Sequence, residues 1–129
     1  MRNTLFSFLL VTISLFANCQ KNSNIQALIE GYKPHDTIPI VEFLKTTELS
    51  LDNKDYTIAS FTTTVMIQGY ANSVASKSNK ITDETKKLFE NLKKNKLKIN
   101  TIYFEDITIL SPINEELKIK TLVCFIRMD

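Results

Sequence analysis

Two adjacent acidic residues and one histidine are the side chains of this sequence best suited to proton transfer or metal binding. Glu105 and Asp106 are neighbours in a segment that alternates like a β-strand, which sends their carboxylates to opposite faces. Acid/base catalysis needs two carboxyl groups that converge across a cleft, so the pair favours a structural role over metal or partner binding. His35 has no second histidine or cysteine near it, and zinc prefers those ligands. The sequence therefore predicts no catalytic residue, no metal site, no other cofactor and no enzymatic activity.

The thiol of Cys19 is the one group for which the sequence predicts a covalent modification. Residues 1–18 carry Arg2 and then an uncharged run from Leu5 to Ala17, which is typical of a secretory signal peptide. As a helix this run spans roughly 20 Å, well short of the roughly 30 Å core of a bilayer. The stretch that ends at Cys19 resembles a bacterial lipobox, in which diacylglycerol is attached to the cysteine. We therefore expect a lipoprotein with acyl chains such as palmitate at Cys19, and ordinary cleavage near Ala17 with a soluble product is the alternative.

The residues after Cys19 indicate where such a lipoprotein would reside. Gln20 stands where lipoproteins retained at the inner membrane commonly have aspartate, so the resemblance implies the outer membrane. No acidic residue follows Lys21 in the next three positions, and this favours the periplasmic face over the cell surface. If Cys19 is acylated, Cys124 has no disulfide partner, and its apolar neighbours predict a small buried side chain. We expect an envelope protein held to the outer membrane by lipid and facing the periplasm.

Lysines are concentrated in one part of the sequence. Residues 77–98 hold eight lysines and three acidic residues, although the whole chain has a net charge of only +2. A basic helix here could bind anionic lipid headgroups, lipopolysaccharide or an acidic protein surface, through Lys86, Lys87, Lys93, Lys94 and Lys96. The alternative is a solvated helix whose lysines favour its C-terminal end. Nucleic acid is disfavoured, because an envelope location is the wrong compartment for it.

The elements that position these residues are predicted to be mainly β. Residues 19–36 are expected to be a tether with one short helix, from a capping-box pattern at Ser23 and Gln26 and a stop at Gly31. Residues 37–129 are expected to form one domain. Within this domain we expect a hairpin of residues 48–51 with 56–68, a poorer strand over 70–76, and long strands over 97–110 and 117–128.

The one clear helix lies between the two groups of strands. Thr82 is its predicted N-cap, Asn95 its predicted end, and Leu88, Phe89 and Leu92 its apolar face. Strands before and after a single helix, without regular βαβ alternation, favour antiparallel sheets. The predicted fold is a small antiparallel, immunoglobulin-like β-sandwich with one inserted α-helix, behind a signal peptide (1–18) and a short helical tether.

Several short motifs resemble those of one protein family. These are Ser60 to Thr62 in a strand, Ser78 to Thr82 leading into the helix, Tyr103 to Ile107 in the next strand, and Pro112 before the last strand. Together they resemble the C-terminal domain of GldM, a protein of the gliding-motility and type IX secretion machinery, over about residues 47–129. The resemblance implies a periplasmic sandwich domain that binds other proteins.

Two functions are therefore considered. The first is a non-enzymatic, lipid-anchored module for protein–protein interaction in the envelope, which binds an unidentified envelope protein through a sheet edge or the basic helix and is associated with the gliding or secretion machinery. The alternative is a binder of a small molecule or lipid, with a cavity between the sheets lined by Phe61, Ile67, Phe104 and Phe125.

Overall fold

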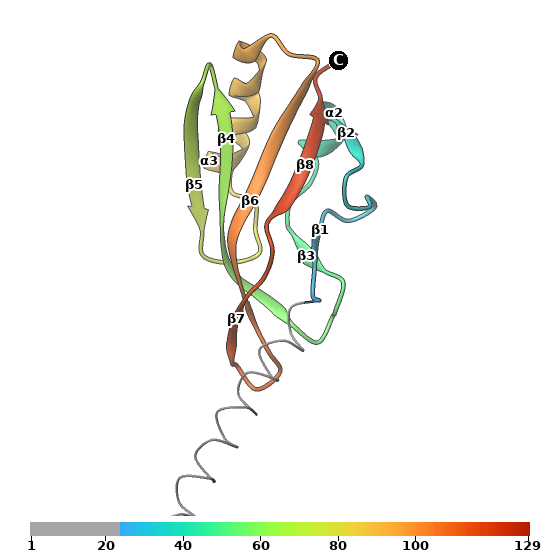
Figure 1. Ribbon diagram of the computed structural model, residues 1–129, viewed down its shortest axis with the longest axis vertical. Helices are drawn as coiled ribbons and strands as arrows, with labels where there is room; N and C mark the ends of the chain where they lie inside the picture. Colours follow the sequence, from blue (N-terminus) through green and yellow to red (C-terminus); the bar gives the residue numbers. More distant parts are fainter. Residues whose placement is uncertain (1–23) are drawn as a thin grey trace, which may run out of the picture.

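A computed structural model describes residues 24–129 of the chain (Figure 1). The signal peptide predicted for residues 1–18 and the lipidation predicted at Cys19 lie outside these residues. No helix within 24–129 combines the length and the apolar character needed to cross a bilayer.

A twisted sheet of six strands dominates the fold. Its order is β2 (Thr37–Pro39), β8 (Leu122–Arg127), β6 (Ile99–Leu110), β4 (Thr57–Ile67) and β5 (Tyr70–Ser76), and β7 (Glu116–Lys118) pairs with β6. All these pairs are antiparallel except β2 with β8, which is parallel. The predicted mainly β fold with one inserted helix is confirmed, and the parallel pair departs from the all-antiparallel expectation.

A second sheet pairs β1 (Ala27–Leu28) with β3 (Ser50–Leu51) in antiparallel register. The helix predicted in the tether is therefore wrong. Ile25, Ala27 and Ile29 alternate into the core with the period of a strand, and this burial outweighs a helical pattern too short to be stable by itself. Gly31 does end the segment, in a left-handed conformation with φ of 87°. Since residues 25–29 pack into the core, the domain begins well before the predicted boundary at residue 37.

The predicted pairing of residues 48–51 with 56–68 is also wrong, because β3 pairs with β1 and β4 pairs with β5 and β6. The β4–β5 hairpin turns through Gln68 and Gly69, which have φ of 50° and 84°. Positive φ at both central residues is the conformation that favours a two-residue hairpin loop. The strand predicted over 70–76 is confirmed as β5.

Helix α3 (Asp83–Asn91) continues into a 3-10 turn, η1 (Leu92–Asn95), and α2 (Ile40–Phe43) is a single turn. The predicted N-cap is confirmed, because the Thr82 hydroxyl accepts a hydrogen bond from the backbone N–H of Thr85. The backbone N–H of Ile81 donates to the carbonyl of Thr47 at 2.9 Å, which fixes the entry to the helix. Phe89 and Leu92 are buried as predicted, and Leu88 is half-buried.

One hydrophobic core joins both sheets and the helix, as in a small β-sandwich. Phe43 and Phe89 pack edge to face with ring centroids 4.8 Å apart, and Phe61 and Phe104 do so at 5.8 Å. The inward face of β4 carries Phe61, Thr63 and Val65, all of which are buried. Aromatic rings therefore fill the centre of the fold.

The two ends of the domain carry different segments (Figure 1). The β4–β5 turn, the end of η1, the start of β6 and the C-terminus lie at the upper end, which we call the distal end. The loop between β6 and β7 forms the lower end, and the described chain begins in the lower half, where Asn24 and Ile25 lie beside the turn of residues 52–56.

Candidate interaction surface

The lysines of the predicted basic helix lie on two elements and on the residue that follows them. Lys86 and Lys87 lie on α3, Lys93 and Lys94 on η1, and Lys96 follows η1 in a left-handed conformation. Lys86 is half-buried and the other four are exposed. Within residues 24–129 none of the five forms an ion pair. Residues 93–98 contain four lysines and no acidic residue, so the distal end is strongly cationic.

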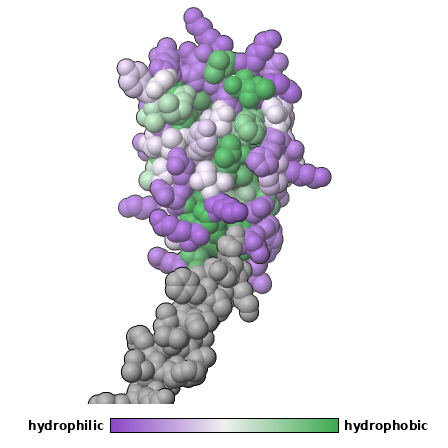
Figure 2. Space-filling view, in the orientation of Figure 1, coloured by the Kyte–Doolittle hydropathy of each residue, from purple (hydrophilic) through white to green (hydrophobic). Residues whose placement is uncertain are grey.

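Exposed apolar side chains gather at the same end. Leu97 is 56% exposed, Ile99 51% and Met66 45%, and two tyrosines near them, Tyr70 and Tyr103, are exposed as well. Five of the seven large apolar side chains exposed in residues 24–129 belong to this group. Figure 2 shows green, hydrophobic atoms at the upper end of the molecule among purple, hydrophilic ones. We call this combination of lysines and apolar side chains the distal surface; it consists of Met66, Tyr70, Lys93, Lys94, Lys96, Leu97, Ile99 and Tyr103.

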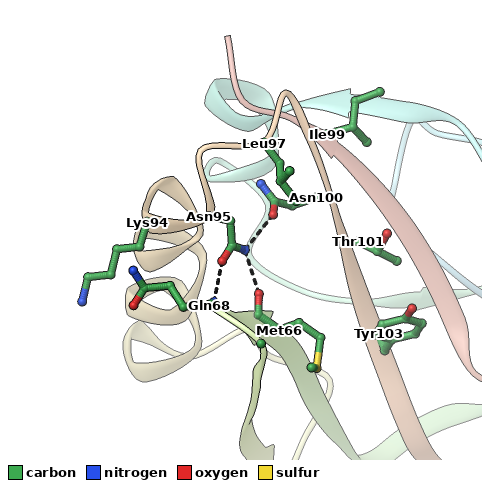
Figure 3. A pocket seen from close by; sticks show the side chains of 10 residues that line it. Met66, Gln68, Lys94, Asn95, Leu97, Ile99, Asn100, Thr101 and Tyr103 are labelled. Carbon is green, nitrogen blue, oxygen red and sulfur yellow. Dashed lines mark hydrogen bonds between the residues drawn. The ribbon is translucent and has the colours of Figure 1, made fainter.

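A groove of about 420 Å³ opens in the distal surface (Figure 3). It lies where β4 and β6 separate, because their pairing ends at Val65 with Ile102. Its walls come from the β4–β5 turn, from the end of η1 and from the outward face of β6. The lining residues are Met66, Gln68, Gly69, Lys94, Asn95, Leu97, Ile99, Asn100, Thr101 and Tyr103.

The side chain of Asn95 holds the two walls of the groove together. Its Oδ1 accepts from the backbone N–H of Gln68 at 2.7 Å, and its Nδ2 donates to the carbonyl of Met66 at 2.7 Å. The same Nδ2 donates to Oδ1 of Asn100 at 2.8 Å. The backbone pairing of β4 with β6 ends before this point, and the hydrogen bonds of Asn95 connect the two sides of the groove instead. Asn95 therefore fixes the shape of the groove.

The other candidate residues do not assemble into a site. A bulge separates Glu105 from Asp106: the register passes from Ser60–Thr108 to Thr62–Glu105, and Asp106 has φ of 48°. Asp106 is exposed, and its Oδ1 lies 4.0 Å from Nζ of Lys118. His35 is exposed in the loop before β2. Within residues 24–129 no three histidine, cysteine or acidic side chains lie close enough together to hold a metal ion.

The residues expected to line a cavity are not brought together. Phe61 and Phe104 are in ring contact inside the core. Phe125 points to the opposite face of the sheet, because its neighbours Cys124 and Ile126 are the inward residues of β8. A ligand cavity lined by all of them is therefore not formed.

Two titratable groups in residues 24–129 have a shifted pKa. Cys124 is buried, as predicted from its apolar neighbours, and burial alone raises the pKa of its thiol to about 12, so the thiol is neutral near pH 7. Nζ of Lys80 lies 2.7 Å from Oε2 of Glu48, and this hydrogen bond and charge lower the pKa of Glu48. The Glu48–Lys80 pair joins the loop before β3 to the loop before α3, away from the distal surface.

The sequence reasoning located the lysines but missed most of the distal surface. Asn95 was expected only to end the helix, and Asn100, Met66, Leu97 and Ile99 were assigned no function. Asn100 could have been noticed in the sequence, because it is a polar residue that alternates with Ile102 and Phe104 and so lies on the buried face of β6.

No protein-family model matches this chain, and no curated protein matches it.

Proposed function

We propose that this chain is a non-enzymatic, lipid-anchored envelope protein that binds a protein partner through its distal surface. The observation that carries the proposal is the concentration of exposed apolar side chains next to unpaired lysines at one end of the domain. Protein interfaces typically combine an apolar centre with a charged rim, and large apolar groups gathered on a surface mark such sites. The resemblance to the C-terminal domain of GldM suggests that the partner belongs to the gliding and type IX secretion machinery.

The position of the distal surface fits an anchor at Cys19. From Cys19 to Asn24 the chain can extend by at most about 18 Å, so a lipid there would hold the lower half of the domain close to the outer membrane. Strand β6 runs twelve residues from the distal end toward the lower end, or roughly 36 Å. The lysines would then be displayed toward the periplasm, and an acidic protein surface becomes a better candidate for them than the headgroups of the anchoring membrane.

A sheet edge adjoins the distal surface and adds to the proposal. Strand β5 forms one edge of the large sheet, and its seven residues, Tyr70–Ser76, carry no charge and no proline. Uncharged edges of this length are suited to pairing with an added strand. The partner can therefore contact both the distal surface and the beginning of β5.

The anchor is tested by the intact mass of the protein purified from the envelope, beside a Cys19→Ala variant. We expect the wild type to carry the mass of acyl chains and to fractionate with membranes, and the variant to lose both. A wild type without acyl mass that fractionates as a soluble protein would overturn the anchor.

The partner surface is tested by affinity capture from detergent-solubilised envelopes with two matched variants. Leu97→Ser alters the distal surface, and Ile113→Ser alters an even more exposed apolar residue, 73% exposed, at the lower end. We expect the same protein to be captured by the wild type and by Ile113→Ser but to be depleted with Leu97→Ser. Equal capture by all three, or no specific protein, would refute the proposal.

A further inference from the structure

Strand β5 is an edge of the large sheet that lacks the usual protection of an exposed edge. Proteins commonly protect an edge with charged side chains, proline, a bulge or a very short strand. The opposite edge strand, β2, has three residues and contains Pro39, and the short β7 carries Glu116 and Lys118. The β4–β5 hairpin has neither a charge nor a proline from Thr57 to Ser76, and the register of its strands is unbroken. The edge of β5 is therefore open to another strand.

A hydrogen bond of Met66 shows which backbone groups of β5 face outward. Its carbonyl accepts from Nδ2 of Asn95, which lies on the β6 side of β4 and not on the β5 side. Both backbone groups of a strand residue point to the same side, so Met66 does not bond to its partner Ala71, and the N–H and C=O of Ala71 point out of the sheet edge. This orientation recurs at every second residue, at Ser73 and Ala75. All three residues are exposed, so a ligand can reach these groups.

The side chains of these three residues leave room for an added strand. Alanine and serine are small, and the Ser73 hydroxyl lies 2.8 Å from that of Thr64, so it is held over β4 and not beyond the edge. From Ala71 to Ala75 the edge spans roughly 13 Å, which a segment of about five residues can cover. Such a segment could form hydrogen bonds with three N–H and three C=O groups.

Lysines flank both ends of β5. Lys77 follows the strand directly and is exposed, and Lys94 lies beside the β4–β5 turn in the lining of the groove, with three more lysines within four positions of it in the chain. No acidic residue lies between Asp55 and Asp83 in the sequence. Charge complementarity therefore favours a segment that is uncharged along the edge and acidic where it reaches the distal end.

The predicted anchor argues against a second copy of the chain as the added strand. Strand β5 runs from the distal end toward the lower end (Figure 1). Antiparallel strands pair slightly more stably than parallel ones, and antiparallel pairing of two β5 strands would turn one copy upside down. Two copies held upright on one membrane through Cys19 have their β5 strands in the same direction, which excludes this arrangement. The added strand is then expected from a different protein.

We propose that an extended segment of the partner protein adds to the large sheet as a strand antiparallel to β5. Its backbone exchanges hydrogen bonds with Ala71, Ser73 and Ala75, and the segment runs toward the distal end. Acidic residues at its C-terminal end then lie beside the lysines of the distal surface. This inference rests on the proposed function, because it specifies how the partner is bound next to that surface.

Two peptides of the same composition and opposite sequence test the proposal. They are N-acetyl-Thr-Val-Thr-Val-Thr-Asp-Asp-amide and N-acetyl-Asp-Asp-Thr-Val-Thr-Val-Thr-amide, titrated into the ¹⁵N-labelled protein in detergent and followed by nuclear magnetic resonance. We expect the first peptide to bind with a dissociation constant on the order of 1 mM. The reversed peptide should bind about threefold more weakly, because its acids lie away from the distal lysines and exposed ion pairs contribute little.

Amide exchange with solvent locates the bound peptide. At a peptide concentration about five times the dissociation constant, the amides of Ala71, Ser73 and Ala75 should exchange about fivefold more slowly, because the bound fraction is protected. The amides of Asn72 and Val74 face β4 and should not change. This measurement uses the wild-type chain and does not depend on the folding of a variant.

Two substitutions at one position separate the backbone from the side chain. Ser73→Pro removes the outward N–H together with the hydroxyl, and Ser73→Ala removes the same hydroxyl but keeps the N–H. Proline is tolerated on an edge strand where the N–H faces solvent, so both variants should fold. Ser73→Pro should weaken binding of the first peptide at least about tenfold, and Ser73→Ala less than about twofold.

Several outcomes would overturn the inference. These are slower exchange at Asn72 and Val74 instead, no slower exchange in β5, equal affinity for the two peptides, and equal binding by the two Ser73 variants. Protection of Ala71, Ser73 and Ala75 that grows with protein concentration in the absence of peptide would assign the edge to a second copy and would also overturn it.

The same experiments distinguish this inference from the proposed function. If neither peptide binds while capture of the partner still depends on Leu97, the proposed function stands and strand addition is refuted. If the first peptide binds at β5 as expected but capture does not depend on Leu97, β5 is a strand-binding edge and the distal surface is refuted as the partner site.

Discussion

Removal of the Asn95 side chain should destabilise the protein far more than its partial exposure suggests. Asn95→Ala deletes three hydrogen bonds of 2.7 to 2.8 Å. Met66 and Gln68 are exposed, so water can replace Asn95 there at a cost of about 0.5–1 kcal/mol each. Oδ1 of the buried Asn100 cannot be rehydrated as easily, and its loss adds roughly 1–3 kcal/mol. We expect a total loss of about 3 kcal/mol in the free energy of unfolding.

Urea denaturation measures this loss, with Asn72→Ala as the matched control. Asn72 makes one side-chain hydrogen bond, to the carbonyl of Tyr70 at an exposed site, so its removal should cost at most about 1 kcal/mol. For a domain of this size the Asn95 variant should shift the urea midpoint by about 2 M with an unchanged slope. The amide of Gln68 should also exchange faster with solvent. A midpoint shift no larger than that of Asn72→Ala would refute the bridging role of Asn95.

Three further predictions concern the cap, the bulge and the buried thiol. Thr82→Ala should cost about 1–2 kcal/mol of unfolding free energy in urea, because it removes the N-cap and leaves the hydroxyl of the buried Thr85 without its partner; an unchanged midpoint would contradict the cap. Asp106→Gly should be tolerated and Asp106→Val should be destabilising by calorimetry, since φ is 48°; equal melting temperatures would contradict the bulge. The Cys124 thiol stays protonated in the folded state up to a pKa of about 12 but ionises near its ordinary value of 9.0 when unfolded. The unfolded state therefore binds fewer protons above pH 9, and stability should fall by at most about 1.4 kcal/mol per pH unit between these values. Cys124→Val should lack this part of the alkaline loss, and an identical pH profile would count against the raised pKa.

The sequence was sufficient to predict those elements whose hydrophobic pattern fits only one type of secondary structure. The inward face of β4 could be predicted because Phe61, Thr63 and Val65 alternate over a long strand. Helix α3 could be predicted because the N-cap residue Thr82 and the apolar residues Phe89 and Leu92 all indicate a helix over the same part of the sequence. In both cases local propensity and tertiary burial favour the same structure.

Elements that depend on distant partners could not be predicted. Ile25, Leu28 and Ile29 fit a helix, but the pairing of β1 with β3 buries Ile25, Ala27 and Ile29 instead. Short apolar segments are ambiguous between the two periods, and contacts elsewhere in the chain decide between them. The parallel pairing of β2 with β8 likewise joins residues about 88 positions apart, which no local pattern encodes.

The candidate site was only partly accessible for the same reason. The lysines are visible as a run in the sequence, but the groove exists only because Asn95 bridges the separated ends of β4 and β6. Leu97 and Ile99 look like ordinary strand residues until their exposure is known. A polar residue in a buried phase, such as Asn100, was the one local sign of this arrangement.

Photo-crosslinking in living cells tests the central claim most directly. A photoreactive residue is placed at Leu97 in one strain and at Ile113 in another, because both side chains are exposed, at 56% and 73%, and lie toward opposite ends of the domain. The account predicts one discrete crosslinked protein from position 97, its loss when Lys93, Lys94 and Lys96 are replaced by glutamate, and no matching product from position 113. The same product from both positions, or none from position 97, would contradict a partner site at the distal surface.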